Sequence, residues 1–184
     1  MSSVKMIAVI GGGQMGSGIA QLTAMHGIDV CLLDVDSQAL STASSSISSS
    51  INRLVSKAHL SQATASEALK RLCFTTNLND LSHADFIIEA IVESEEVKKA
   101  LFLQLDKIAK SSAILASNTS SISITRLASS TTRPKQVIGM HFMNPPPVMK
   151  LIEIVRGADT SEDTFAATKA LSQSCYSEKS DGGR

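Results

Sequence analysis

A histidine and a glutamate flank three consecutive prolines in the stretch HFMNPPPVMKLIE, residues 141–153. An imidazole titrates near neutral pH, and a carboxylate on its second nitrogen fixes the tautomer and stabilises the protonated ring. His141 and Glu153 would therefore make a general base if the fold brings them together, although a histidine after a strand can be structural and Glu153 can be a surface charge. Prolines fix φ and donate no backbone hydrogen bond, so we expect residues 145–147 to form a stiff, extended connector outside helices and central strands.

A glycine-rich stretch near the start of the chain could bind phosphate. The sequence IGGGQMGS supplies the pattern G-x-G-x-x-G at Gly11, Gly13 and Gly16. The first glycine permits the turn, the second lets a pyrophosphate approach the backbone, and the third lets helix and strand pack closely. The pattern alone is weak, since ordinary tight turns also contain glycine. It gains weight because an apolar strand pattern precedes it, a helical pattern follows it, and Asp34 comes near the expected offset of ~20 residues.

The helix that begins at this stretch would present free N–H groups and a positive dipole end to phosphates. We therefore expect Gln14 and Met15 to contact a dinucleotide together with the three glycines. Asp34 can accept hydrogen bonds from both ribose hydroxyls but would repel a 2′-phosphate, which favours NAD over NADP. The alternative is a turn of the same shape that binds no nucleotide.

Apolar patterning along the chain predicts strands and helices in alternation. Helices are expected at residues 14–26, 36–58, 62–71, 95–110 and 161–171, and strands at residues 4–10, 28–33, 72–75, 85–89, 113–116, 136–140 and 150–155. The long helix at residues 36–58 contains a serine-rich stretch, so an aliphatic stripe must hold it against the core. This order indicates an α/β fold with a mostly parallel sheet and helices on both faces.

Composition excludes several classes of protein. The 184 residues carry 17 basic and 17 acidic side chains, which gives no basic excess for nucleic acid. No apolar run is long enough to span a membrane, and no N-terminal targeting segment is evident. The three cysteines cannot all pair with one another and lack metal-ligand spacing, so we expect a reducing compartment and no metal. The compartment itself, cytoplasmic or peroxisomal, stays open.

Four stretches carry a resemblance to a known family: VIGGGQMGSGIAQ, IIEAIVESEEVKK, LASNTSSISITRLA and GMHFMNPPPVMKLIEIV. Together they resemble the N-terminal NAD-binding domain of the NAD-dependent 3-hydroxyacyl-CoA dehydrogenases. The resemblance implies a Rossmann-type, doubly wound domain over residues 1–171 and oxidation of 3-hydroxyacyl-CoA to 3-oxoacyl-CoA, as in fatty-acid β-oxidation. A dehydrogenase of small free hydroxy acids is a weaker alternative, because the stretch at residues 141–153 is typical of the CoA-substrate family.

The resemblance also implies roles for individual residues. His141 would be the base, Glu153 the carboxylate that orients it, and Ser120 a contact to both substrate and nicotinamide ribose. Further cofactor contacts would come from Glu93, Lys98, Asn118 and Asn144, and contacts to CoA from Ser50 and Lys57. For Glu93 and Lys98 an exposed charge pair on a helix is the alternative, and for Lys57 a solvated helix lysine.

The resemblance ends near residue 171. Family members continue with a helical C-terminal domain, whereas residues 172–184 read as a divergent, polar, disordered tail. We therefore expect a chain that binds NAD but turns over its substrate poorly, and that associates with itself as a homo-oligomer. The alternative function is a non-catalytic NAD-binding module that regulates or pairs with a full-length subunit.

Overall fold

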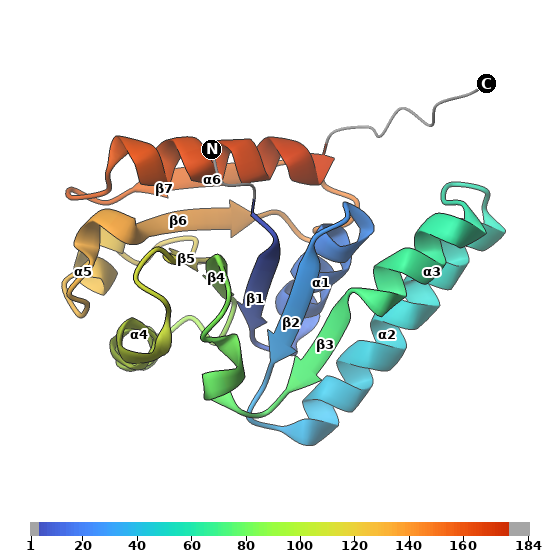
Figure 1. The fold of residues 1–184 in the computed structure, drawn as a ribbon, viewed down its shortest axis with the longest axis horizontal. Helices are drawn as coiled ribbons and strands as arrows, with labels where there is room; N and C mark the ends of the chain where they lie inside the picture. Colours follow the sequence, from blue (N-terminus) through green and yellow to red (C-terminus); the bar gives the residue numbers. More distant parts are fainter. Residues whose placement is uncertain (1–3, 177–184) are drawn as a thin grey trace.

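A computed structural model describes residues 4–176 of the chain (Figure 1). The strands are β1 (Met6–Ile10), β2 (Asp29–Leu33), β3 (Leu72–Thr75), β4 (Phe86–Glu89), β5 (Ile114–Ser117), β6 (Val137–Phe142) and β7 (Ile152–Arg156). The α-helices are α1 (Gln14–Met25), α2 (Ser37–Ser56), α3 (Gln62–Lys70), α4 (Glu95–Ile108), α5 (Ile124–Ala128) and α6 (Glu162–Tyr176), and two 3-10 turns are η1 (Leu78–Leu81) and η2 (Pro134–Gln136). None of the helices within residues 4–176 is long and apolar enough to cross a membrane.

The strands form one sheet in the order β3-β2-β1-β4-β5-β6-β7. All neighbouring strands run parallel except β7, which pairs antiparallel with β6. The chain adds β2 and β3 on one side of β1 and β4 to β7 on the other, so the order reverses at the β1–β4 boundary. The predicted doubly wound, Rossmann-type fold is therefore confirmed, and ligands of such sheets bind at the carboxyl ends of the strands near this reversal.

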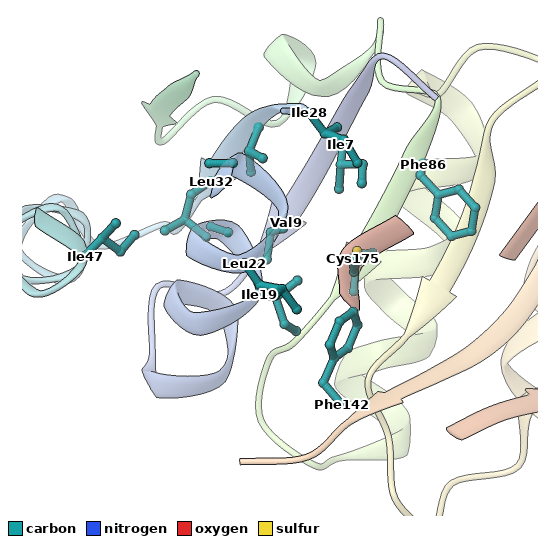
Figure 2. Packing of buried hydrophobic residues seen from close by; sticks show 14 of the residues in the cluster. Ile7, Val9, Ile19, Leu22, Ile28, Leu32, Ile47, Phe86, Phe142 and Cys175 are labelled. Carbon is teal, nitrogen blue, oxygen red and sulfur yellow. The ribbon is translucent and has the colours of Figure 1, made fainter. Parts of the chain in front are cut away.

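The sheet is covered on both faces by apolar layers. Successive side chains of β1 alternate, with Ile7 and Val9 in one cluster and Ala8 and Ile10 in the other. The first cluster joins α1, α2, α3 and α6 to the sheet, and Figure 2 shows part of it. The second cluster packs α4 and α5 on the opposite face. This two-sided burial explains why the strands read as continuous apolar runs.

The serine-rich helix α2 is held by an aliphatic stripe, as predicted. Its buried residues are Leu40, Ala43, Ile47 and Ile51, at helical spacing. Asp36 caps its N-terminus by accepting a hydrogen bond from a backbone N–H of the first turn. Because serine contributes little to helix stability, this stripe and the cap hold α2 on the domain.

The structure corrects two expectations near the C-terminal part. Helix α6 continues through Tyr176, so residues 172–176 are helical and do not belong to a polar tail, while residues 177–184 lie outside the described range. The proline connector is a hydrogen-bonded turn and not an extended segment, because the N–H groups of Val148 and Met149 both donate to the carbonyl of Pro145. Prolines suit the start of such a turn, where no N–H is needed.

Candidate active site

The glycine-rich turn joins β1 to α1 with very close backbone packing. Gly11 has a φ of 114°, a conformation that favours glycine, and a Cβ there would lie 2.4 Å from the carbonyl oxygen of Ala90. A Cβ on Gly16 would lie 1.7 Å from the carbonyl oxygen of Gly11. The two positions therefore exclude side chains. The predictions that Gly11 permits the turn and that Gly16 allows close packing are confirmed.

The middle glycine of the pattern faces open space. Within residues 4–176, a Cβ on Gly13 would meet no other heavy atom within 4 Å. Gly13 is also the N-cap of α1 and makes no side-chain cap hydrogen bond. The backbone N–H groups at Gln14 and Met15 begin the helix, where orphan donors and the positive dipole end coincide. This open, electropositive position fits a pyrophosphate.

Asp34 follows β2 and faces the same turn. Its Oδ2 accepts a hydrogen bond from the backbone N–H of Gly12 at 2.7 Å, and its Oδ1 accepts one from the N–H of Asp36 at 2.9 Å. Each carboxylate oxygen still has a lone pair for a ribose hydroxyl. Asp34 thus fixes the shape of the turn and can also accept hydrogen bonds from the hydroxyl groups of a ribose bound next to it.

We expect Asp34→Asn to weaken NADH binding by about tenfold, the effect of replacing a charge-assisted hydrogen bond by a neutral one. The preference for NADH over NADPH should shrink as well, since the repelling charge is gone. Fluorescence titration with both nucleotides measures this, with Asp29→Asn as the control because Asp29 lies at the other end of β2 and is exposed. An unchanged NADH to NADPH affinity ratio would contradict the ribose role.

His141 and Glu153 meet across the antiparallel β6–β7 pair. They are direct partners in the strand register, and His141 Nδ1 lies 3.0 Å from Glu153 Oε2. The carboxylate accepts the Nδ1 hydrogen, which leaves Nε2 as the basic atom of the neutral ring. The predicted contact between the two side chains is therefore confirmed.

The connector that follows β6 lies on α1. A Cβ on Gly18 of α1 would approach Pro146 Cδ to 2.7 Å, and the Tyr176 hydroxyl at the end of α6 donates to the Pro146 carbonyl at 3.3 Å. Asn144 immediately precedes the prolines in this connector. Contact with α1 within its first two turns keeps the His141 end of β6 near the glycine-rich turn.

Asn118 joins the end of β5 to the same region. Its side-chain Oδ1 accepts the backbone N–H of Phe142 at 2.8 Å, and its own N–H donates to the Glu89 carbonyl at 2.8 Å. Phe142 is the neighbour of His141, so Asn118 fixes the backbone beside the candidate base. The family resemblance implies that Asn118 contacts the cofactor, and Asn118 follows β5 at the carboxyl edge of the sheet, where ligands of such folds bind.

Glu93 organises the loop that carries Ser120. Its Oε1 accepts the Thr119 hydroxyl and the Ser120 backbone N–H at 3.3 Å. Partial burial acts to raise the pKa of Glu93, but the hydrogen bond from Thr119 and the charge of Lys98 outweigh it and hold the pKa below its usual value. Glu93 therefore stays ionised at neutral pH and holds exposed Ser120 at the site.

Lys98 is buried in an ion-pair network beneath this loop. Its Nζ lies 2.5 Å from Glu89 Oε2 and 3.3 Å from Glu93 Oε2, and the side chains of Lys98 and Glu89 are both 0% exposed. Glu89 also accepts the Ser117 hydroxyl at 2.5 Å and the Ile91 N–H at 2.8 Å. The alternative of an exposed charge pair on a helix is wrong, because Lys98 is buried and Glu93 precedes α4.

The sequence did not identify three residues of this network, Glu89, Ser117 and Thr119. The signal that could have found Glu89 is an acidic residue at the end of the apolar strand FIIE, with Lys98 on the following helix. A buried carboxylate needs a cation or several donors, so such a charge in a buried strand predicts a partner nearby.

Removing the buried cation should cost far more stability than removing Lys99, the partly exposed lysine next to it. We expect Lys98→Met to lower the free energy of unfolding by about 3–5 kcal/mol, because Glu89 is left without its counter-ion in the core. Lys99→Met is the matched control: Lys99 is adjacent in sequence and makes a surface pair with Glu95, so about 0.5 kcal/mol or less is expected. Urea unfolding of both variants measures the difference. Equal losses in the free energy of unfolding would show that the buried ion pair contributes no more to stability than the surface pair.

Ser50 and Lys57 lie in the second half of α2 and at its C-terminal end, respectively. Ser50 accepts a hydrogen bond from Gln21 of α1 at 2.9 Å, and Lys57 is the C-cap of α2. Since α2 begins just after Asp34 and its 20 residues span ~30 Å, Lys57 is at the far end of this helix. Their predicted contacts to CoA stay predictions.

Within residues 4–176, no cluster of three or more His, Cys, Asp or Glu side chains could hold a metal ion. The chemistry-bearing groups described above are a base, a carboxylate, hydroxyls and backbone N–H groups. Groups of these types can bind an organic cofactor and transfer protons.

Known proteins match this chain over nearly its whole length. The family described as "3-hydroxyacyl-CoA dehydrogenase, NAD binding domain" matches residues 6–179. The chain belongs to the 3-hydroxyacyl-CoA dehydrogenase family. The matched family domain binds NAD, and the turn at Gly11–Gly16 with open space over Gly13 fits this cofactor.

Relatives and solved structures agree with this assignment. A 3-hydroxybutyryl-CoA dehydrogenase of Bradyrhizobium diazoefficiens is 46% identical over 166 residues, 90% of this chain and 57% of that protein. One of Clostridioides difficile is 48% identical over 168 residues, 91% of this chain and 60% of that protein. The crystal structure of an Escherichia coli 3-hydroxybutyryl-CoA dehydrogenase superposes with a TM-score of 0.93 at 42% identity, over 95% of this chain and 37% of that one. The chain thus spans 57–60% of the length of these two curated relatives.

Proposed function

We propose that the chain binds NAD at the carboxyl edge of its sheet and that His141 acts there as the base in oxidation of a 3-hydroxyacyl-CoA, as in fatty-acid β-oxidation. The observation that carries the proposal is the 3.0 Å contact between His141 Nδ1 and Glu153 Oε2. It occurs in a domain of an NAD-binding family, on a strand whose following connector packs on α1 beside the glycine-rich turn.

Each side chain has a role that follows from its contacts. Glu153 accepts the Nδ1 hydrogen of His141, so Nε2 can take the proton of the substrate hydroxyl, and the carboxylate stabilises the imidazolium that forms. NAD, which the glycine-rich turn and Asp34 would hold, would supply the acceptor for the hydride from C3 of the substrate. The Ser120 hydroxyl can donate to the substrate oxygen and accept from the cofactor ribose, while Ser50 and Lys57 would contact the CoA moiety.

A second candidate function is an NAD-binding module that pairs with a longer subunit. The supporting observation is the openness of the base within the described residues: the Glu153 side chain is 56% exposed, and nearby Val148 and Leu151 are 69% and 51% exposed. Turnover requires a water-excluding pocket and an oriented acyl chain. We therefore expect oxidation by this chain alone to be slow.

Two measurements separate these functions. Fluorescence titration with NADH tests nucleotide binding, and reduction of acetoacetyl-CoA, followed as loss of NADH absorbance, tests catalysis. Saturable binding with turnover supports the dehydrogenase, whereas saturable binding without turnover supports the module. Absence of saturable binding would contradict both.

A further inference from the structure

Two cysteines that are far apart in the sequence are side by side in the sheet. Cys31 of β2 and Cys73 of β3 are direct partners in the parallel register. Paired residues of neighbouring strands point to the same face, and the two sulfur atoms are 3.3 Å apart, with the Cys31 thiol donating to Cys73 Sγ. The pair includes none of the nucleotide or base residues described above.

The two thiols differ sharply in access. Cys31 is 1% exposed and belongs to the core cluster on the α4 face. Cys73 is exposed and lies on β3, which is the edge strand of the sheet. A reagent in solution can therefore react with Cys73 first. Cys31 then reacts only with a sulfur that is already bonded to Cys73.

The backbone spacing suits a covalent bond between them. Neighbouring strands lie about 4.7–4.9 Å apart, inside the Cα separation of about 4.4–6.8 Å found across disulfides. For a disulfide, the sulfur atoms have to approach from 3.3 Å to about 2.05 Å, and we expect rotation of the two side chains to supply this change.

Burial raises the pKa of the Cys31 thiol to about 12, with the neighbouring Cys73 and the charge of Asp80 acting in the same direction. Cys31 therefore keeps its proton at neutral pH and is a poor first nucleophile, since the thiolate is the reactive form. This difference in access and pKa gives the two thiols different roles. Cys73 reacts with the reagent, and Cys31 then resolves the mixed disulfide on Cys73.

We propose that Cys73 and Cys31 are a thiol modification site that a low-molecular-weight disulfide, such as oxidised glutathione, converts to an intrachain disulfide. The Cys73 thiolate attacks one sulfur of the small disulfide, forming a mixed disulfide and releasing one thiol. Cys31 then attacks Cys73 Sγ and forms the Cys31–Cys73 bond as the mixed-disulfide bond breaks, and the leaving thiolate takes the Cys31 proton. The two protein thiols are oxidised by two electrons, and the small disulfide is reduced to two thiols.

The test is to incubate the native chain with oxidised glutathione, block free thiols, digest without reductant and identify cross-linked peptides by mass spectrometry. We expect a peptide pair that joins Cys31 to Cys73 and disappears with dithiothreitol. Wild-type protein that carries glutathione on Cys73 with Cys31 still free, or that links only between chains, would overturn the proposal.

Three variants complete the test. Cys31→Ala should leave glutathione trapped on Cys73, and Cys73→Ser should abolish the cross-link and protect Cys31. Cys175→Ser is the control, since Cys175 is buried in the other core cluster on α6, and its cross-link should equal that of wild type. A variant is compared only if its circular dichroism matches wild type, and a cross-link that survives in Cys73→Ser would refute the assignment of the pair.

Discussion

Replacement of His141 by glutamine should reduce oxidation of 3-hydroxyacyl-CoA by about 10²–10⁴-fold, the contribution expected of a general base. The amide cannot take the hydroxyl proton, whereas its size and polarity suit the half-buried place of the imidazole beside Glu153. NADH binding should be unchanged, because His141 is not among the contacts proposed for the nucleotide. Steady-state assay of the acyl-CoA reaction and fluorescence titration with NADH measure the two effects separately.

The control is His83→Gln, because His83 is exposed and lies just before β4, at the edge of the sheet opposite the site. It should leave both measurements at their wild-type values. If His141→Gln loses nucleotide binding together with turnover, the residue is structural and the assignment of the base is wrong.

The second large effect concerns two glycines of one motif. Gly16→Ala should destabilise the fold by about 3 kcal/mol, the upper part of the range for overpacking, since its Cβ would lie 1.7 Å from the Gly11 carbonyl oxygen. Gly11 cannot easily retreat, because its own Cα faces the Ala90 carbonyl. Saturable NADH binding should be lost together with the shape of the turn.

Gly13→Ala makes the matched comparison. Its Cβ meets no atom of the described residues within 4 Å, so stability should fall by only about 1 kcal/mol, the cost of alanine at an N-cap. NADH binding should nevertheless weaken about tenfold or more, since the methyl group fills the space of the pyrophosphate. Urea unfolding and NADH titration of both variants test this contrast. Equal stability losses with equal binding losses would mean that Gly13 is a packing position like Gly16.

The parts of the site whose conformation is set by residues close together in the sequence could be predicted from the sequence. The turn at Gly11–Gly16 combines a strand, a helix start and a glycine pattern within a short stretch, so its conformation depends on neighbours in the chain. The contact between His141 and Glu153 was also predicted, but through family resemblance. Residue types alone do not set the β6–β7 register that makes these two residues partners.

The parts that depend on long-range packing were missed. The Lys98–Glu89 pair needs α4 to cover the end of β4, and the Cys31–Cys73 contact needs the register between two strands separated by α2 and α3. The connector was expected to be extended, because proline alone does not reveal the turn closed by Val148 and Met149. In each case, tertiary pairing decides which side chains meet.

A crystal structure of the chain with bound NAD tests the account most directly. We expect the pyrophosphate over Gly13 at the start of α1, the ribose hydroxyls on Asp34, and the nicotinamide ring in the region bounded by Ser120 and His141. A nucleotide bound elsewhere on the domain, or a nicotinamide ring on the side of the sheet away from His141, would contradict it.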